Sequence, residues 1–167
     1  LKAGWFAEAQ AELKTLPDPQ TPEERLVRSR MLVAAFDHFS AVKMFNQSLS
    51  DKYELFNLSL AQYVFPREYE NIVREKSKIS GVDSALVWGL MRQESSFRAK
   101  VVSSSDAFGL MQLLTGTAQE VASAYKWKVP LRWPEDLYDP EINIKLGTTY
   151  LSRMVAAFNG HVPLALA

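Results

Sequence analysis

The chain has 167 residues, enough for one well-packed domain or for a small domain with part of a neighbour. Its 19 Lys and Arg residues balance its 19 Asp and Glu residues, which argues against a nucleic-acid partner, because a general nucleic-acid binder needs a basic excess. The absence of cysteine excludes disulfides and thiolate chemistry. No apolar run approaches the roughly 18 to 20 residues of a membrane span.

The N-terminal part of the chain predicts successive helices. The first residues, Leu1 to Phe6, lack both an initiating Met and a signal-peptide layout, so we expect a processed or trimmed N-terminus. A first helix is predicted from about Lys2 to Leu16, where Pro17-Asp18-Pro19 ends it. A second begins at Thr21-Pro22-Glu23-Glu24, which has the residue types of an N-cap, a proline at the first helical position and a capping box.

Further apolar-periodic stretches are joined by very short connections. They cover about Arg25 to His38, Ser40 to Leu49 and Asp51 to Phe65. Together with only seven glycines, they predict an all-α protein that begins with a helical array or superhelical segment over residues 1–65. No repeat of fixed period is visible there. Phe65-Pro66 is the predicted boundary, because the residue before a proline is biased away from helix.

A helix predicted over about Ser84 to Ser96, with Asp83 as its cap, carries the candidate catalytic acid. At about 100° per residue, Val87, Leu90, Met91 and Glu94 fall on one stripe. The register that buries the apolar residues is therefore expected to turn Glu94 inward. A carboxyl among apolar groups has a raised pKa and can donate a proton, as glycosidic cleavage requires. Two alternatives are that Glu94 pairs with a cation from another helix, or that it lies near water at the end of the stripe.

Several motifs follow in a fixed order. Arg92-Gln93-Glu94-Ser95-Ser96-Phe97 is followed by Ala107-Phe108-Gly109-Leu110-Met111-Gln112-Leu113, then by Thr117-Ala118 and by Asp139-Pro140-Glu141-Ile142-Asn143-Ile144. This ordered set, from about Pro66 to Ala167, resembles the soluble lytic transglycosylase family. By itself, Asp139-Pro140 is a good helix start.

The resemblance implies a lysozyme-like helical catalytic domain over residues 66–167 that acts on peptidoglycan glycan strands in the periplasm, without a cofactor. It implies that Glu94 is the single acid and base, and that Ser103 and Gln112 contact the substrate. Ser95 and Gly109 are further substrate-binding candidates, although a tight turn alone would also explain a glycine. No metal site is expected, because the two histidines, at positions 38 and 161, lie far apart without ligand spacing.

The chain departs from the family pattern in three places. The family often has Pro-x-Gly after its loop serine, where this chain reads Ser104-Ser105-Asp106, and Leu114 stands where Met is usual. Asp106 could also be a second carboxylate. The family continues after a run like Leu164 to Ala167 into Ala-Tyr-Asn-Ala-Gly, which supplies a tyrosine to the site. We therefore expect a fragment or truncated form with an incomplete cleft.

Three other functions compete with the lytic transglycosylase hypothesis. A goose-type-lysozyme-like hydrolase would share the helix with Glu94 but would use water and leave a reducing end. A non-catalytic scaffold or glycan-binding module is compatible with the missing tyrosine segment. A plain helical interaction domain would require the ordered motifs to be coincidental.

Overall fold

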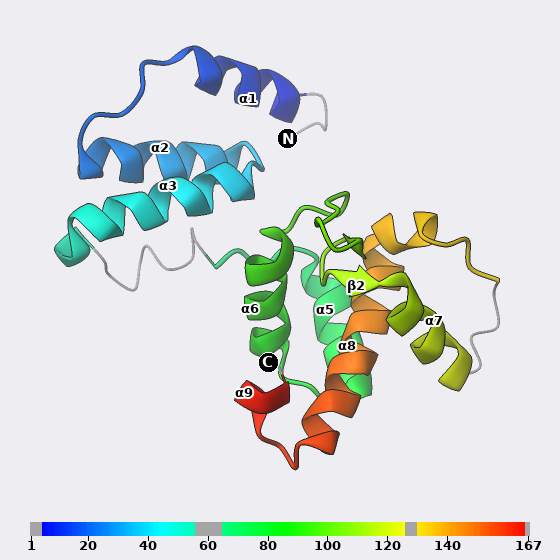
Figure 1. Ribbon diagram of the computed structural model, residues 1–167. Coiled ribbons are helices and arrows are strands. Elements are labelled where there is room, and N and C mark those ends of the chain that lie inside the picture. Colours follow the sequence, from blue (N-terminus) through cyan, green and yellow to red (C-terminus); the bar gives the residue numbers. More distant parts are fainter. Residues whose placement is uncertain (1–4, 56–64, 126–129, 166–167) are drawn as a thin grey trace. The chain divides into compact units, whose positions relative to one another are not determined.

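Helices dominate the protein, as the composition predicts. The computed structural model describes residues 5–55, 65–125 and 130–165. The chain divides into two compact units, Leu1–Pro66 (unit 1) and Arg67–Ala167 (unit 2) (Figure 1). Within the described residues, the only strands are the short antiparallel pair β1 (Ala107–Phe108) and β2 (Leu113–Leu114). The all-α prediction is confirmed, with this hairpin as an addition.

Unit 1 consists of short helices, and the start of α2 follows the predicted signals. They are α1 (Trp5–Thr15), α2 (Pro22–Ala34), α3 (His38–Asp51) and the 3-10 helix η1 (Tyr53–Leu55). The capping box of α2 is confirmed: the backbone N–H of Glu24 donates to Thr21 Oγ1 at 3.1 Å, and the N–H of Thr21 donates to Glu24 Oε2 at 3.3 Å. These bonds satisfy donors that a helix start otherwise leaves unpaired.

The boundary between α2 and α3 differs from the prediction. Helix α2 ends at Ala34 rather than near His38, because Phe36 adopts a left-handed φ of 59°. Asp37 then caps α3 by accepting a bond from the N–H of Ser40 at 3.1 Å. Of the stretch predicted as helical from Asp51 to Phe65, residues 56–64 lie outside the described residues.

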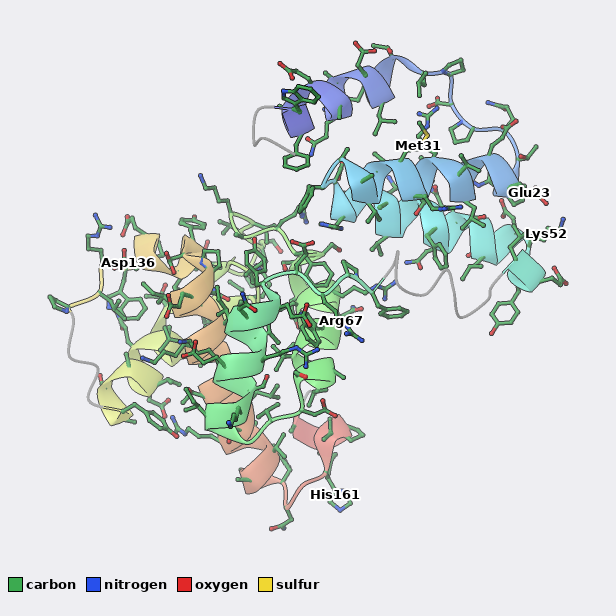
Figure 2. The ribbon with its side chains drawn as sticks, turned by 180° about the vertical axis from the view of Figure 1, so that it is seen from behind. Glu23, Met31, Lys52, Arg67, Asp136 and His161 are labelled. Atoms are coloured by element: carbon green, nitrogen blue, oxygen red, sulfur yellow. The ribbon has the colours of Figure 1, made fainter. Side chains whose placement is uncertain are left out.

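The ends of α2 and α3 are also joined by charge. Lys52, directly after α3, donates to Glu23 Oε1 in the first turn of α2 at 2.6 Å (Figure 2). This bond lowers the pKa of Glu23 and raises that of Lys52. Both side chains are exposed, so the pair fixes local geometry more than it adds stability.

Unit 2 is arranged around one long helix. Its elements, besides the hairpin, are α5 (Glu70–Ser80), α6 (Ser84–Ser95), α7 (Thr115–Ala124), the 3-10 helix η2 (Glu135–Tyr138), α8 (Pro140–Ala157) and α9 (Val162–Ala165). Helix α8 packs against α5, α7, η2 and α9 (Figure 1). It contributes buried residues to both apolar clusters of the unit, Ile144 and Leu151 to one and Leu146 to the other. Side chains of α8 therefore lie at the centre of the unit, between the two apolar clusters.

The two predicted helix starts of unit 2 are confirmed. Asp83 accepts a bond from the N–H of Ala85 at 2.8 Å, and Asp139 accepts one from the N–H of Ile142 at 3.0 Å. Each carboxylate also lies at the positive end of a helix dipole. Among the helices of the described residues, none combines the length and the apolar character that crossing a bilayer requires.

Candidate active site

A pocket of about 220 Å³ in unit 2 contains the predicted acid. Its walls come from α6, the β2 region, α7, α8 and α9. The lining residues are Leu90, Glu94, Met111, Gln112, Leu113, Leu114, Thr117, Gly147, Tyr150, Leu151, Met154 and Ala165. The set is largely apolar with a few polar groups, the composition typical of small-molecule sites.

Glu94 lies at this pocket but is not buried, contrary to the sequence expectation. The buried residues of α6 are Val87, Met91 and Ser95, which follow one another at four-residue spacing. Leu90 and Glu94 belong to the adjacent row, where Leu90 is half-buried and Glu94 is exposed. The predicted buried face of α6 included the row of Leu90 and Glu94, whereas the buried row is the neighbouring one. Glu94 therefore faces the pocket rather than the core.

The surroundings of Glu94 still perturb its carboxyl group. Partial desolvation raises the pKa of Glu94 above its ordinary value, and it is the one cause of the shift. Although the residue as a whole is exposed, its carboxyl lies at a wall that includes Leu90 and Met111, which takes away part of its hydration. Within the described part of the chain, Glu94 makes no ion pair, so the alternative of a paired structural carboxylate is not what this structure contains.

Gln112 lies at the same pocket as Glu94, in a constrained conformation. Its φ is 47°, and its side-chain Nε2 donates to the carbonyl of Gly109 at 2.9 Å and to that of Val101 at 3.4 Å. These bonds use the amide donors and leave the amide oxygen as the acceptor for a ligand.

Ser95 occupies a different place from the one predicted for a substrate-binding residue. Only 2% of it is exposed, and its hydroxyl contacts the carbonyl of Leu110 at 2.8 Å and that of Met91 in its own helix at 2.9 Å. A hydroxyl held in the core in this way cannot reach a sugar. It links α6 to the turn that precedes Gln112.

Ser103 and Gly109 do not line the pocket. The hydroxyl of Ser103 accepts bonds from the N–H groups of Ser105 and Ala107, at 3.2 and 3.1 Å, which shapes the loop before β1. Gly109 is buried with φ +75°, and a Cβ there would lie 2.4 Å from both Asn143 Nδ2 and the Leu137 carbonyl. The close approach that requires glycine is therefore to α8 and η2, not to the helix with Glu94.

Three positions were missed by sequence reasoning. Tyr150 and Thr117 line the pocket, although neither was among the predicted site residues. Gly147, Tyr150, Leu151 and Met154 share one face of α8 at spacings of three and four, so the helical period could have identified Tyr150. The third, Asn143, is completely buried and was interpreted only as part of a helix start.

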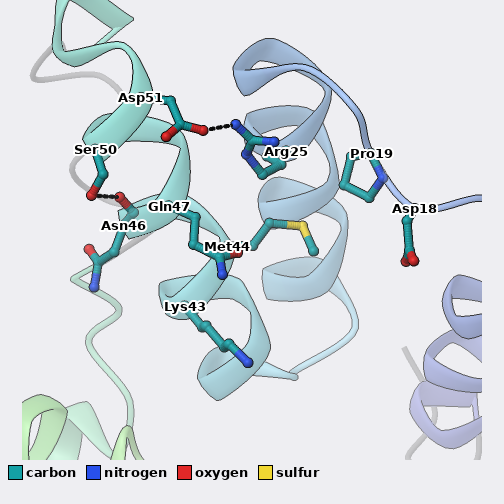
Figure 3. A pocket seen from close by; sticks show the side chains of 9 residues that line it. All are labelled: Asp18, Pro19, Arg25, Lys43, Met44, Asn46, Gln47, Ser50 and Asp51. Carbon is teal, nitrogen blue, oxygen red and sulfur yellow. Dashed lines mark hydrogen bonds and ion pairs between the residues drawn. The ribbon is translucent and has the colours of Figure 1, made fainter.

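A second, more open pocket of about 710 Å³ lies within unit 1 (Figure 3). Arg25 of α2 and Asp51 of α3 form an ion pair across it, and Lys43, Asn46 and Gln47 of α3 line it. It contains none of the motif residues of unit 2.

Solved structures of known proteins share the fold of this chain. The fold matches that of lytic transglycosylases of known structure. An inactive mutant of lytic transglycosylase Slt from Pseudomonas aeruginosa has a TM-score of 0.75 and 27% identity, over 95% of this chain and 24% of that one. The 70-kDa soluble lytic transglycosylase in complex with bulgecin A has a TM-score of 0.76 and 22% identity, over 96% of this chain and 25% of that one. Unit 2 is thus a lysozyme-like helical domain.

The Transglycosylase SLT domain profile matches residues 71–167, and the chain belongs to this family. Among its relatives, membrane-bound lytic murein transglycosylase C of Edwardsiella ictaluri (strain 93-146) is 41% identical over 97 residues, which are 57% of this chain and 26% of that protein. The corresponding protein of Serratia proteamaculans (strain 568) is 42% identical over 87 residues, 51% of this chain and 24% of that protein. The chain thus spans about a quarter of the length of these relatives.

Proposed function

We propose that the protein is a peptidoglycan lytic transglycosylase that cleaves the β-1,4 bond between N-acetylmuramic acid and N-acetylglucosamine. The observation that carries the proposal is an acid with a raised pKa and no cationic partner in the described residues, at a largely apolar pocket that the Gln112 amide also lines. Family membership over residues 71–167 supports it. In this proposal residues 66–167 form the catalytic domain, and residues 1–65 are part of a helical array that precedes it.

Glu94 is proposed to act first as an acid. Its raised pKa increases the fraction of protonated carboxyl near neutral pH, and the leaving glycosidic oxygen needs that proton as the bond breaks. The substrate's own acetamido group stabilises the cation that develops at the muramic acid. Gln112, whose side-chain donors are held by backbone carbonyls, offers its amide oxygen to a sugar hydroxyl or N–H.

Glu94 then acts as a base in the second half of the reaction. The carboxylate takes the proton of the muramic C6 hydroxyl, whose oxygen forms the new bond to C1 and closes a 1,6-anhydro ring. The acid is thereby regenerated, and no water is consumed. Glu94 is the one carboxylic acid among the described lining residues, and Asp106, in an exposed loop, is not part of the lining. A single acid is sufficient for this sequence of steps.

A peptidoglycan substrate places the protein outside the cytoplasm, and we propose a periplasmic location. The names of the relatives, which are murein transglycosylases described as membrane-bound or soluble, support an extracytoplasmic site of action.

Digestion of purified peptidoglycan tests the proposal directly. The longest natural form of the protein that contains these residues is compared with Glu94→Gln, and the products are analysed by mass spectrometry. Glu135→Gln, an exposed acid of η2 outside the pocket, is the matched control. We expect anhydro-ended fragments from the wild type and from Glu135→Gln, and none from a folded Glu94→Gln variant.

Each other product identifies a competing function. Fragments heavier by one water would identify a hydrolase of the goose-type-lysozyme kind. Binding to peptidoglycan without any released fragment would identify a glycan-binding module. Turnover by Glu94→Gln at the wild-type rate would refute the assignment of the acid.

A further inference from the structure

Asn143 is the most completely bonded buried polar side chain near the candidate site. It is fully buried, on α8, and bonds to backbone groups of two other segments, the turn at residues 108–111 and η2. Its Nδ2 donates to the carbonyl of Phe108 at 2.9 Å and to that of Leu137 at 2.8 Å, and its Oδ1 accepts from the N–H of Met111 at 2.9 Å. Both amide hydrogens and the amide oxygen are hydrogen-bonded, and these bonds offset the free-energy cost of removing the amide from water.

These bonds hold both ends of one tight turn. Phe108 and Met111 flank Gly109 and Leu110, so the side chain of Asn143 fixes the turn from the α8 side. The turn packs closely against Asn143, since a Cβ at Gly109 would lie 2.4 Å from Asn143 Nδ2. A turn bonded at both ends and packed this closely cannot shift without breaking hydrogen bonds.

The same turn is bonded from α6 through the residue next to Glu94. The hydroxyl of Ser95 contacts the carbonyl of Leu110 at 2.8 Å. Gln112 follows directly on Met111, and both its backbone N–H and its Nε2 donate to the carbonyl of Gly109, at 3.3 and 2.9 Å. A short chain of contacts therefore runs from the backbone beside Glu94, through the turn, to Gln112.

We propose that Asn143 is a positioning residue of the proposed reaction: by fixing residues 108–111 on α8, it sets the position of the Gln112 side chain in the pocket that Glu94 also lines. This inference rests on the proposed function. Asn143 is buried and does not line the pocket, so its effect passes through Gln112. It predicts that the two residues are energetically coupled in catalysis.

A double-mutant cycle on the rate of anhydro-product formation tests this coupling. The proteins are the wild type, Asn143→Ala, Gln112→Ala and the double variant, assayed well below their melting temperatures. We expect Asn143→Ala to lower kcat about 10- to 100-fold with KM nearly unchanged, because a misplacement of about 1 Å can cost that much. The double variant should be no slower than the slower single variant, since residues that act as a unit are not additive.

Thr148→Ala is the matched control for loss of stability. Thr148 is 1% exposed on the same helix, and among the residues that the structure describes its hydroxyl bonds only to the carbonyl of Lys145, one turn earlier. It should lose stability but keep kcat. If Thr148→Ala loses as much activity as Asn143→Ala, or if the effects of Asn143→Ala and Gln112→Ala multiply, Asn143 has only a structural role and the inference is wrong.

Asn143→Asp keeps the volume of the side chain and covers the case in which Asn143→Ala fails to fold. Its carboxyl can donate one hydrogen bond only when protonated, so its activity relative to the wild type should rise as the pH falls. A ratio that does not change with pH contradicts the inference. The wild-type products and Glu94→Gln, run in parallel, separate the claims: a wild type that forms no anhydro ends refutes the proposed function, and wild-type turnover by Glu94→Gln refutes the assignment of the acid. Anhydro products from the wild type, an inactive Glu94→Gln variant and an additive cycle together refute only the role of Asn143.

Discussion

Adding one methyl group at Gly109 probes the turn beside the pocket most directly. Gly109→Ala places a Cβ in a left-handed conformation, φ +75°, which costs about 1–2 kcal/mol for an L-residue. The same Cβ would lie 2.4 Å from the carbonyl oxygen of Leu137, a backbone atom that cannot rotate away. Overpacking of this kind costs about 1–3 kcal/mol. The free energy of unfolding should therefore fall by about 2–5 kcal/mol.

Other glycines of unit 2 separate the two costs. Gly81 has φ +71° and open space around its Cβ position, so Gly81→Ala should cost only the conformational strain of about 1–2 kcal/mol. At Gly147, within α8, a Cβ would meet Met111 Sδ at 2.3 Å, so Gly147→Ala carries the overpacking cost without the strain of a left-handed backbone. Gly89 of α6 has neither problem, and Gly89→Ala should stabilise the protein by about 0.5–1 kcal/mol.

Urea denaturation of the four variants measures these differences as shifts of the midpoint at constant slope. Anhydro-product formation by the folded variants measures the effect on the site. Gly109→Ala should lose both stability and activity, whereas Gly81→Ala should lose stability alone. Equal losses of stability at Gly109 and Gly81 would refute the reasoning, because they would mean that the contact with Leu137 and Asn143 costs nothing.

The remaining predictions concern charge, ligand contact and capping. Because desolvation raises the pKa of Glu94, kcat/KM should decline with increasing pH only above that raised pKa. Leu90→Asn, which admits water beside the carboxyl, should lower the pKa of Glu94 and move this alkaline limb of the pH–rate profile to lower pH. Tyr150→Leu should raise KM for glycan fragments about 2- to 10-fold in steady-state kinetics, through loss of aromatic contact with a sugar; an unchanged KM would remove Tyr150 from the site. Thr21→Ala should lower the stability of unit 1 by about 1 kcal/mol in urea titrations and leave cleavage unchanged.

The features that the sequence predicted best are those whose partners lie within a few residues. Asp83 and Asp139 bond to N–H groups two and three residues ahead, so their residue types alone indicate the helix starts. The direction of Glu94 was harder. Helical spacing puts Leu90 and Glu94 beside the buried row, and only the packing of α6 decides which row faces the core. The sequence predicted the helix that carries Glu94 but not the degree of burial of this residue, which is exposed at the pocket.

Contacts between distant segments explain what the sequence did not predict. Asn143 bonds to residues 32 and 35 positions away, and Ser95 to one 15 positions away, so no local pattern could reveal either contact. All three bonds end on the turn before Gln112. The motif residues therefore divide by position in the packed domain: Glu94 and Gln112 face the pocket, whereas Ser95 and Asn143 hold the turn between them from two helices. A substitution of Ser95 or Asn143 should therefore alter the shape of the pocket, although neither residue lines it.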